Sequence, residues 1–145
     1  MTGTAEIADL NQAQCLQLLG ADGFGRVVFT TASMPAVTPV RYHLDGNEVI
    51  FRVPPDGPLA KATRNAVVGF QADDIDPTTH TGWSVLGVGL AYEITDPNRR
   101  ADLATSPTTH IVAVPLQQLT GHRVTLGHVG GNLATPHAGS PVATQ

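Results

Sequence analysis

The chain has 145 residues and a formal net charge of −4, with 41% hydrophobic and 14% charged residues. This length predicts one domain with a sizeable core, and the acidic balance argues against the broad basic surface that nucleic-acid binding needs. Charged residues make up roughly 25% of an average protein. The low charge density therefore favours a surface that is partly covered, for example by a second copy of the chain.

Cys15 is the only cysteine, which excludes an intrachain disulfide and a zinc site built from cysteines. It lies among leucines in a predicted helix, where a buried thiol is the expected role. The first ten residues lack the basic and apolar regions of a signal peptide, and no apolar run approaches the roughly 18 residues of a membrane span. We therefore expect a cytoplasmic protein that does not contact membranes.

The start of the chain predicts one short helix. Residues 1–9 are expected to be a flexible lead-in, as chain termini commonly are. Asp9 or Asn11 can cap a helix that runs to about Leu19, and Gly20 is the residue type that ends such a helix.

A β-rich region follows this helix. Asp45-Gly46 between two apolar runs is a strong hairpin signal, and Pro39 predicts an edge position or a bulge because proline cannot donate to a sheet. Short helices are expected over 58–65 and 96–104. The expected strands share β-branched and aromatic residues between turn residues, and they cover 23–31, 35–44, 47–53, 66–75, 83–95 and 110–126, the last with a return.

These elements predict a mainly β domain over residues 10–126. About six antiparallel strands with peripheral helices are expected, and closure into a barrel is the usual way to remove exposed sheet edges. Residues 127–145 contain few large apolar side chains and are expected to form a flexible tail.

Arg52 is the most informative residue of its strand. Alternation places Val49, Phe51 and Val53 on one face of the strand and Ile50 and Arg52 on the other. A guanidinium cannot lose its proton, so a buried arginine needs an anionic partner. That partner is either a carboxylate of the protein or a bound anion.

The two alternatives for Arg52 use different neighbours. Asp56 or Asp73 would supply the carboxylate. A bound anion is most simply a phosphate, which the start of the following helix and the basic residues Lys61 and Arg64 would help to hold. The sequence leaves both alternatives open.

The remaining motifs are less specific. Trp83 opens a strand and is either a core or interface aromatic or one wall of a ligand site. Gly87 and Gly89 do not form a dinucleotide-binding motif and are expected to mark close backbone approach within a sheet. The six histidines lack metal-binding spacing, Cys15 has no activating partner, and no G-x-S-x-G motif occurs, so neither a metal nor a nucleophile is predicted.

Four segments together resemble the pyridoxamine 5′-phosphate oxidase-like flavin-binding proteins, and more narrowly the small actinobacterial-type branch with a Gly-Trp-Ser-Val element. The resemblance covers about residues 10–126, in order and with similar spacing. The segments that carry it are PVRYHLDGNEVIFRV, AVVGFQADDID, TGWSVLGVGLA and HIVAVPLQQLTGHRV.

The resemblance implies a six-stranded antiparallel split barrel that forms a homodimer. It implies FMN, or a deazaflavin relative in some branches, bound in two equivalent clefts at the dimer interface. The implied function is an FMN-dependent oxidoreductase acting on a small organic substrate. A deazaflavin-dependent reductase and a non-catalytic or cofactor-free relative are the alternatives.

The resemblance also implies which residues contact the cofactor. The stretch 38–42 would line one side of the flavin ring, Arg52 and the backbone after it would take the phosphate, and Trp83 and Ser84 would approach from the other subunit. The implied cofactor-binding set is Thr38, Pro39, Val40, Arg41, Phe51, Arg52, Val53, Lys61, Trp83 and Ser84.

Three places differ from the usual pattern of the family. Val53 stands where a serine or threonine is common, and Pro58 stands where a lysine is common. Lys61 lies near one helical turn beyond Pro58 and is expected to replace that lysine in part. Arg41 stands where asparagine is common, and it either adds an anion contact or narrows the cleft.

Overall fold

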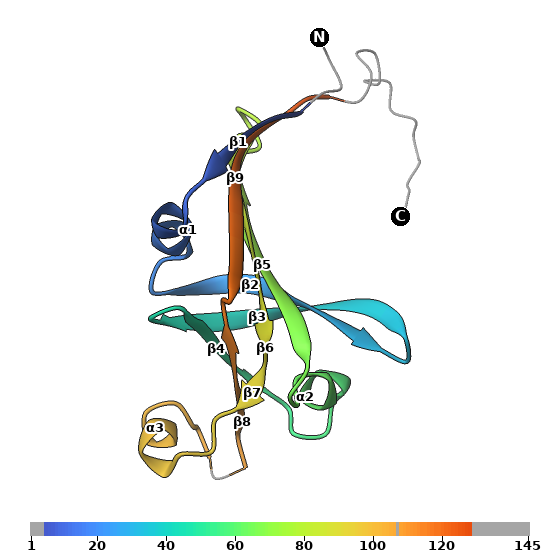
Figure 1. Ribbon diagram of the computed structural model, residues 1–145, viewed down its shortest axis with the longest axis vertical. Coiled ribbons are helices and arrows are strands. Elements are labelled where there is room, and N and C mark those ends of the chain that lie inside the picture. The colour runs from blue at the N-terminus through green and yellow to red at the C-terminus, as the bar shows by residue number, and fades with distance from the viewer. Residues whose placement is uncertain (1–4, 107, 129–145) are drawn as a thin grey trace.

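The computed structural model describes residues 5–106 and 108–128. One antiparallel sheet dominates the fold, and three short helices lie against it (Figure 1). The strands are β1 (Ala5–Leu10), β2 (Asp22–Thr31), β3 (Met34–Asp45), β4 (Glu48–Val53), β5 (Val67–Ile75), β6 (Thr81–Leu90), β7 (Tyr92–Glu93), β8 (His110–Pro115) and β9 (Gln118–Leu126). The helices are α1 (Gln12–Leu19), α2 (Pro58–Ala62) and α3 (Pro97–Ala101).

The mainly β class is confirmed, but the sheet has nine strands where six were expected. Its order is β1-β9-β6-β5-β2-β3-β4-β8-β7. Part of the expected flexible lead-in is a strand, because β1 pairs with β9 along its whole length. The long strand expected over 83–95 is interrupted, since β6 ends at Leu90 and β7 pairs with β8 instead. The return expected after 110 is the ninth strand, β9.

The sheet curls into a half-barrel in which β6 approaches β8 at Gly89 and the residue after β8 at Gly87. A Cβ atom at Gly89 would overlap the carbonyl oxygen of Pro115, and one at Gly87 would overlap the side chain of Leu116. The expectation of close backbone approach is therefore confirmed at Gly89, whereas Gly87 makes room for a side chain. The curl places the inner faces of β2 to β6 and β8 around one core.

The main core fills the inside of the half-barrel, where Phe51 and Phe70 are among its largest fully buried side chains. The rings of Tyr42 and Phe70 pack edge to face with centroids 4.9 Å apart. A second, smaller cluster lies on the other side of β4 and β8; its buried members are Ile50, Ile94, Ile111 and Ala113. The predicted alternation of β4 is therefore confirmed, and both of its faces are covered.

Local sequence signals place the helix and turn ends correctly. Asn11, rather than Asp9, caps α1 through a reciprocal pair of hydrogen bonds with Gln14, and Gly20 follows the helix with a φ of 69°. Cys15 is buried, as expected. Pro39 lies where β3 pairs with β2 but not with β4, which matches its predicted edge position.

Two tight hairpins shape the middle of the chain. Asp45-Gly46 turns β3 into β4 as predicted, with Gly46 at a φ of 63°. Ala32 and Ser33 turn β2 into β3, with φ values of 51° and 64°. The β2–β3 hairpin projects away from the other strands (Figure 1).

The C-terminal tail, residues 127–145, was predicted to be flexible and lies almost entirely outside the described residues. Within residues 5–106 and 108–128, no helix is long and apolar enough to cross a membrane.

Candidate functional site

A cleft of about 610 Å³ opens on the outer face of β3, β4 and β8. The segment after α3 forms one wall through Asp102 and Leu103, and Arg41 and Arg52 come from the strands. Ile50 and the β8 residue Ile111 also line this cleft, and both belong to the second cluster. The site therefore combines a buried apolar base with two arginines and two aspartates, Asp22 and Asp102.

Arg52 is held in the cleft by a backbone group. Its Nε donates a hydrogen bond of 2.6 Å to the carbonyl oxygen of Leu103. No side chain or backbone group in the described ranges accepts a hydrogen bond from its two terminal nitrogens. One edge of the guanidinium is thus fixed while the other edge remains able to bind an anion in a bidentate manner.

The carboxylate alternative for Arg52 is wrong for both candidate aspartates. Asp73 lies 3.5 Å from Arg26, so its charge is paired elsewhere. Asp56 lines a different groove. The sequence missed the true partner because a backbone carbonyl 51 positions away leaves no mark in the residue pattern.

Arg41 lines the same cleft as Arg52. The β3–β4 ladder ends at the pair His43 and Ile50, and each arginine lies two residues beyond this pair on its own strand. Arg41 is exposed, and no carboxylate of the described chain lies within ion-pair distance of it. Two guanidinium groups without a carboxylate partner thus share one cleft, which favours an anionic ligand.

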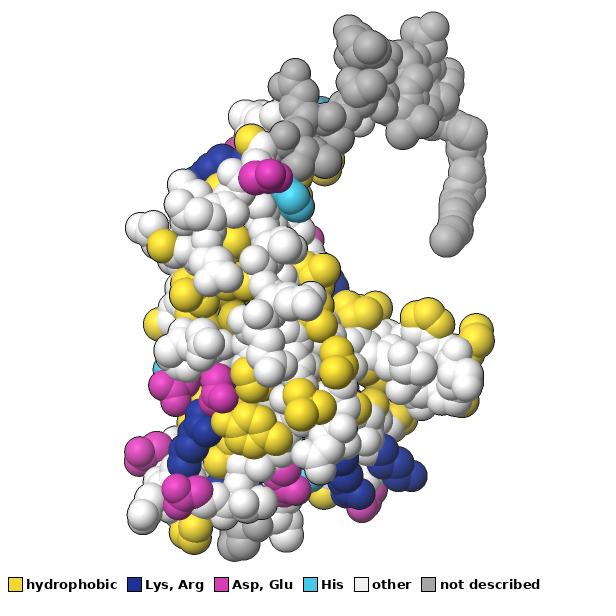
Figure 2. All heavy atoms as spheres, viewed as in Figure 1, with side chains coloured by type: hydrophobic (Ala, Val, Ile, Leu, Met, Phe, Trp, Pro, Cys, Tyr) yellow, Lys and Arg dark blue, Asp and Glu magenta, His cyan; other side chains and the backbone are white. Residues whose placement is uncertain are grey.

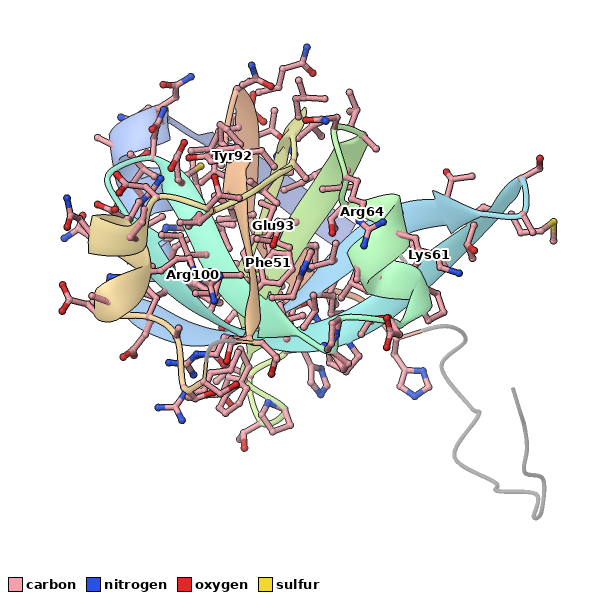
Figure 3. The ribbon with its side chains drawn as sticks, turned by 90° about the horizontal axis from the view of Figure 1, so that it is seen from below. Phe51, Lys61, Arg64, Tyr92, Glu93 and Arg100 are labelled. Carbon is pink, nitrogen blue, oxygen red and sulfur yellow. The ribbon has the colours of Figure 1, made fainter. Side chains whose placement is uncertain are left out.

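Lys61 does not join this cleft within one protomer. It lies on α2 and lines a groove of about 450 Å³ with Pro58 and the end of β2. Figure 3 shows Lys61 and Arg64 on the α2 side of the sheet and Arg100 on the α3 side, with Phe51 between them. The cradle suggested by Arg52, Lys61 and Arg64 is therefore divided between two surfaces.

Several residues of the cofactor-binding set implied by the resemblance have side chains that are buried and cannot contact a ligand. Val40, Phe51 and Val53 are buried in the main core, so any contribution they make to a ligand is through the backbone. Thr38 is half-buried on the inner side of β3, and Pro39 is exposed on the outer side.

Trp83 and Ser84 lie on opposite faces of β6. Trp83 packs partly against the main core. Ser84 belongs to a polar cluster on the outer face, where Nε2 of Gln71 donates to Ser84 Oγ at 3.2 Å and to the carboxylate of Asp73 at 2.8 Å. Because β5, β2 and β3 separate β6 from β4 in the sheet, one protomer does not bring Ser84 to the Arg52 cleft.

A hydrogen-bonded cluster that the sequence did not reveal fastens α3 to the sheet. The hydroxyl of Tyr92 donates to the carboxylate of Glu48 at 2.7 Å and accepts from Arg99 at 2.8 Å. Arg99 also contacts Glu48 at 2.8 Å and Asp45 at 3.3 Å. The hydrogen bonds to Glu48 and Tyr92 raise the pKa of Arg99, so its guanidinium stays protonated. We call Glu48, Tyr92 and Arg99 the α3 anchor.

The α3 anchor predicts a loss of stability at alkaline pH. Burial raises the pKa of Tyr92 above its ordinary value of 10, and the hydrogen bond to Glu48 adds to this rise while Arg99 opposes it. The folded state therefore holds the phenolic proton more tightly than the unfolded state, so this contribution is full below pH 10 and falls as pH rises further. In urea unfolding between pH 8 and 11, Tyr92→Phe should lose less stability with pH than the wild type; parallel curves would contradict this.

Two of the described histidines each pair with one carboxylate. His110 Nδ1 lies 3.2 Å from Glu93, and His122 Nδ1 lies 3.1 Å from Asp9. Among residues 5–106 and 108–128, no three His, Cys, Asp or Glu side chains gather as a metal-binding set.

Exposed apolar side chains lie on the outer face of β2, β3, β5 and β6, around the polar cluster of Gln71, Asp73 and Ser84. Phe24, Val37 and Val67 are 79%, 57% and 67% exposed, and Leu86 and Leu90 lie beside them on β6. Figure 2 shows hydrophobic side chains along the projecting hairpin and over the adjoining body. We call these five residues the outer apolar face; large apolar side chains exposed on one face of a sheet are a candidate interaction surface.

The fold and the cleft define a class of protein: a curled antiparallel split barrel with a cleft on its outer face that is lined by two arginines. The family model described as pyridoxamine 5′-phosphate oxidase matches residues 11–130. The chain belongs to this family, and the resemblance seen in its sequence is confirmed.

Two solved structures and one curated protein show the range of its relatives. The FAD-binding protein from Mycobacterium smegmatis is 32% identical, with a TM-score of 0.70 over 81% of this chain and 98% of that chain. An FAD-binding protein from Mesorhizobium loti is 19% identical and shares the fold, with a TM-score of 0.70 over 81% and 97% of the two chains. An uncharacterized protein of Mycobacterium tuberculosis is 39% identical over 101 residues, which span 66% of each chain.

Proposed function

We propose that this protein is a flavin-dependent oxidoreductase of small organic substrates that works as a homodimer. One observation carries the proposal: the cleft between β3, β4 and α3 presents two guanidinium groups, of Arg41 and Arg52, without a carboxylate partner in the described chain. Asp22 and Asp102 also line the cleft, but neither forms an ion pair with Arg41 or Arg52. The two guanidinium groups therefore remain able to bind an anionic ligand.

The residues of the cleft fit a flavin phosphate. Arg52 would take the phosphate through its free terminal nitrogens, since its Nε is already bonded to Leu103. A cleft of about 610 Å³ is within the usual range for ligand sites of this kind. When bound, the flavin supplies hydride transfer, and the protein supplies placement, exclusion of water and charge complementarity. No side chain of the cleft is assigned as an acid or base.

FMN and FAD are both candidates for the flavin. FMN is the cofactor that the sequence resemblance implies. FAD is favoured by two observations: both solved relatives described above are FAD-binding proteins, and Arg41 supplies a second cation that a second phosphate group would use. A deazaflavin in the same cleft is the alternative that the same chemistry allows.

The outer apolar face supports the proposed homodimer. Its exposed side chains lie on the same side of the sheet as Ser84 and Arg26, so a second copy seated there would cover them. A partner's β6 would then bring its outer-face Ser84 toward the Arg52 cleft, which Ser84 of the same protomer does not reach. The buried, unpaired Cys15 is compatible with the reducing cytoplasm, which we keep as the proposed location.

Val67→Asp tests the dimer. An aspartate at a position 67% exposed in the protomer costs little in the fold but would bury a charge in the interface. We expect light scattering after gel filtration to show a monomer, where the wild type is a dimer. Val67→Thr keeps the branched shape and strand preference and should remain a dimer. A dimeric Val67→Asp protein would contradict this placement of the interface.

An absorption spectrum of the purified protein tests the flavin itself. We expect a yellow protein that releases FMN or FAD on denaturation, or an apoprotein that quenches the fluorescence of added FMN or FAD. Selective binding of the deazaflavin would instead support the alternative cofactor. Colourless protein that binds none of the three would overturn the proposal in favour of a cofactor-free relative.

A further inference from the structure

We propose that Arg99 is a positioning residue for the cleft: through the α3 anchor it holds the Leu103 carbonyl where that oxygen orients the guanidinium of Arg52. The inference rests on the proposed function only in taking the ligand of the cleft to be a flavin. The contacts themselves belong to this chain and are testable without a flavin.

The first step is the attachment of α3 to the end of the β3–β4 hairpin. Arg99 bonds Glu48 at 2.8 Å and the Tyr92 hydroxyl at 2.8 Å, and that hydroxyl bonds Glu48 as well. The three groups form a closed triangle of charge-assisted hydrogen bonds, and the Arg99 and Glu48 side chains are 31% and 22% exposed. Such partly buried bonds define a geometry better than a fully exposed ion pair does.

The second step carries that attachment to the carbonyl. α3 is a short helix that ends at Ala101, and Leu103 follows its C-cap residue Asp102, with the Leu103 backbone nitrogen bonded to the carbonyl of Arg100 at 3.0 Å. Arg100 fastens the other side of α3, since its guanidinium bonds the Thr109 carbonyl at 2.9 Å. Leu103 itself packs against the second cluster beneath it. The carbonyl of Leu103 is therefore placed by the whole α3 segment.

The third step is the contact with the cleft. Arg52 receives no orienting bond in the described chain other than the one from its Nε to the Leu103 carbonyl. Its long side chain has many rotamers, so this single bond selects the one in which the terminal nitrogens face the cleft. If the α3 segment becomes more mobile, the Arg52 guanidinium keeps its charge but no longer has a fixed orientation.

The direct test is hydrogen exchange of the Arg52 Nε–H followed by NMR in the flavin-free protein. The signal is assigned by its disappearance in Arg52→Lys. We expect Arg99→Gln and Tyr92→Phe to speed this exchange by about tenfold because the bond to Leu103 opens more often. Arg123→Gln, which removes the same charge from an exposed position on β9, should leave it unchanged. Unchanged exchange in both anchor variants would overturn the proposal, whatever the protein binds.

A double-mutant cycle on FMN affinity is the second test. Arg99→Gln should weaken FMN binding by about tenfold in the wild-type background and by less than about twofold in the Arg52→Ala background, because the effect passes through Arg52. Equal losses in both backgrounds would show that Arg99 acts independently of Arg52 and would refute the positioning role. If the wild type binds no flavin, the proposed function fails and the exchange test still decides this inference. If Arg99→Gln fails to fold, Tyr92→Phe takes its place in the cycle.

Discussion

Replacing Arg52 with alanine is expected to weaken flavin binding by about 1.5–3 kcal/mol, or roughly 10- to 150-fold, because a charge-assisted contact to the phosphate is lost. The free energy of unfolding should change by less than about 0.5 kcal/mol, since the side chain is exposed and forms one hydrogen bond to a backbone carbonyl. Fluorescence titration of FMN and FAD, together with urea unfolding, measures both quantities on the same variant.

The pattern of the two measurements distinguishes the roles of Arg52. Arg52→Lys should bind with intermediate affinity, because it keeps the charge but cannot bond Leu103 and a phosphate at the same time. Arg123→Ala removes a cation from an exposed site on β9 and serves as the control for net charge. Unchanged affinity with a clear drop in stability would mean that Arg52 is a structural residue of the α3 wall.

Gly89→Ala is expected to lower the free energy of unfolding by about 3 kcal/mol or more, the largest effect on stability predicted for this chain. The new methyl group would overlap the carbonyl oxygen of Pro115, which is backbone and cannot rotate away. Either β6 or β8 must move, and that movement separates the two strands where they close the half-barrel over the main core. The urea midpoint of the variant measures the loss.

Gly69→Ala is the matched control for Gly89→Ala. It lies on the neighbouring strand β5, and the nearest atom to its added Cβ would be 3.4 Å away, an ordinary contact. We expect its stability to lie within about 1 kcal/mol of the wild type. Equal effects at the two glycines would indicate a general cost of alanine in this sheet, and the close approach of β6 to β8 would then not be what holds the barrel shut.

Local signals in the sequence were sufficient for much of the fold. The cap at Asn11, the turn at Asp45-Gly46 and the alternation around Arg52 are decided by neighbouring residues, and each lies where it was predicted. β1 was missed because its residues carry little strand signal, and it forms through pairing with β9, more than a hundred positions away.

The candidate site shows the same division between local and distant information. Arg41 and Arg52 were predicted as ligand residues and do share a cleft, because strand pairing brings them together. Lys61 was grouped with them by sequence distance, yet α2 presents it to another groove. The α3 anchor was missed entirely, since it joins Glu48 to residues more than forty positions away through side-chain geometry alone.

The turn of the β2–β3 hairpin has a consequence for association. Both of its central residues, Ala32 and Ser33, adopt positive φ values, the arrangement whose twist matches that of the paired strands. Such a turn fixes the direction of the β2–β3 hairpin before any partner binds, although neither residue is a glycine and each adds backbone strain. The entropy cost of ordering this hairpin is thus part of folding and not of association, so the hairpin is preorganised when it binds a second copy.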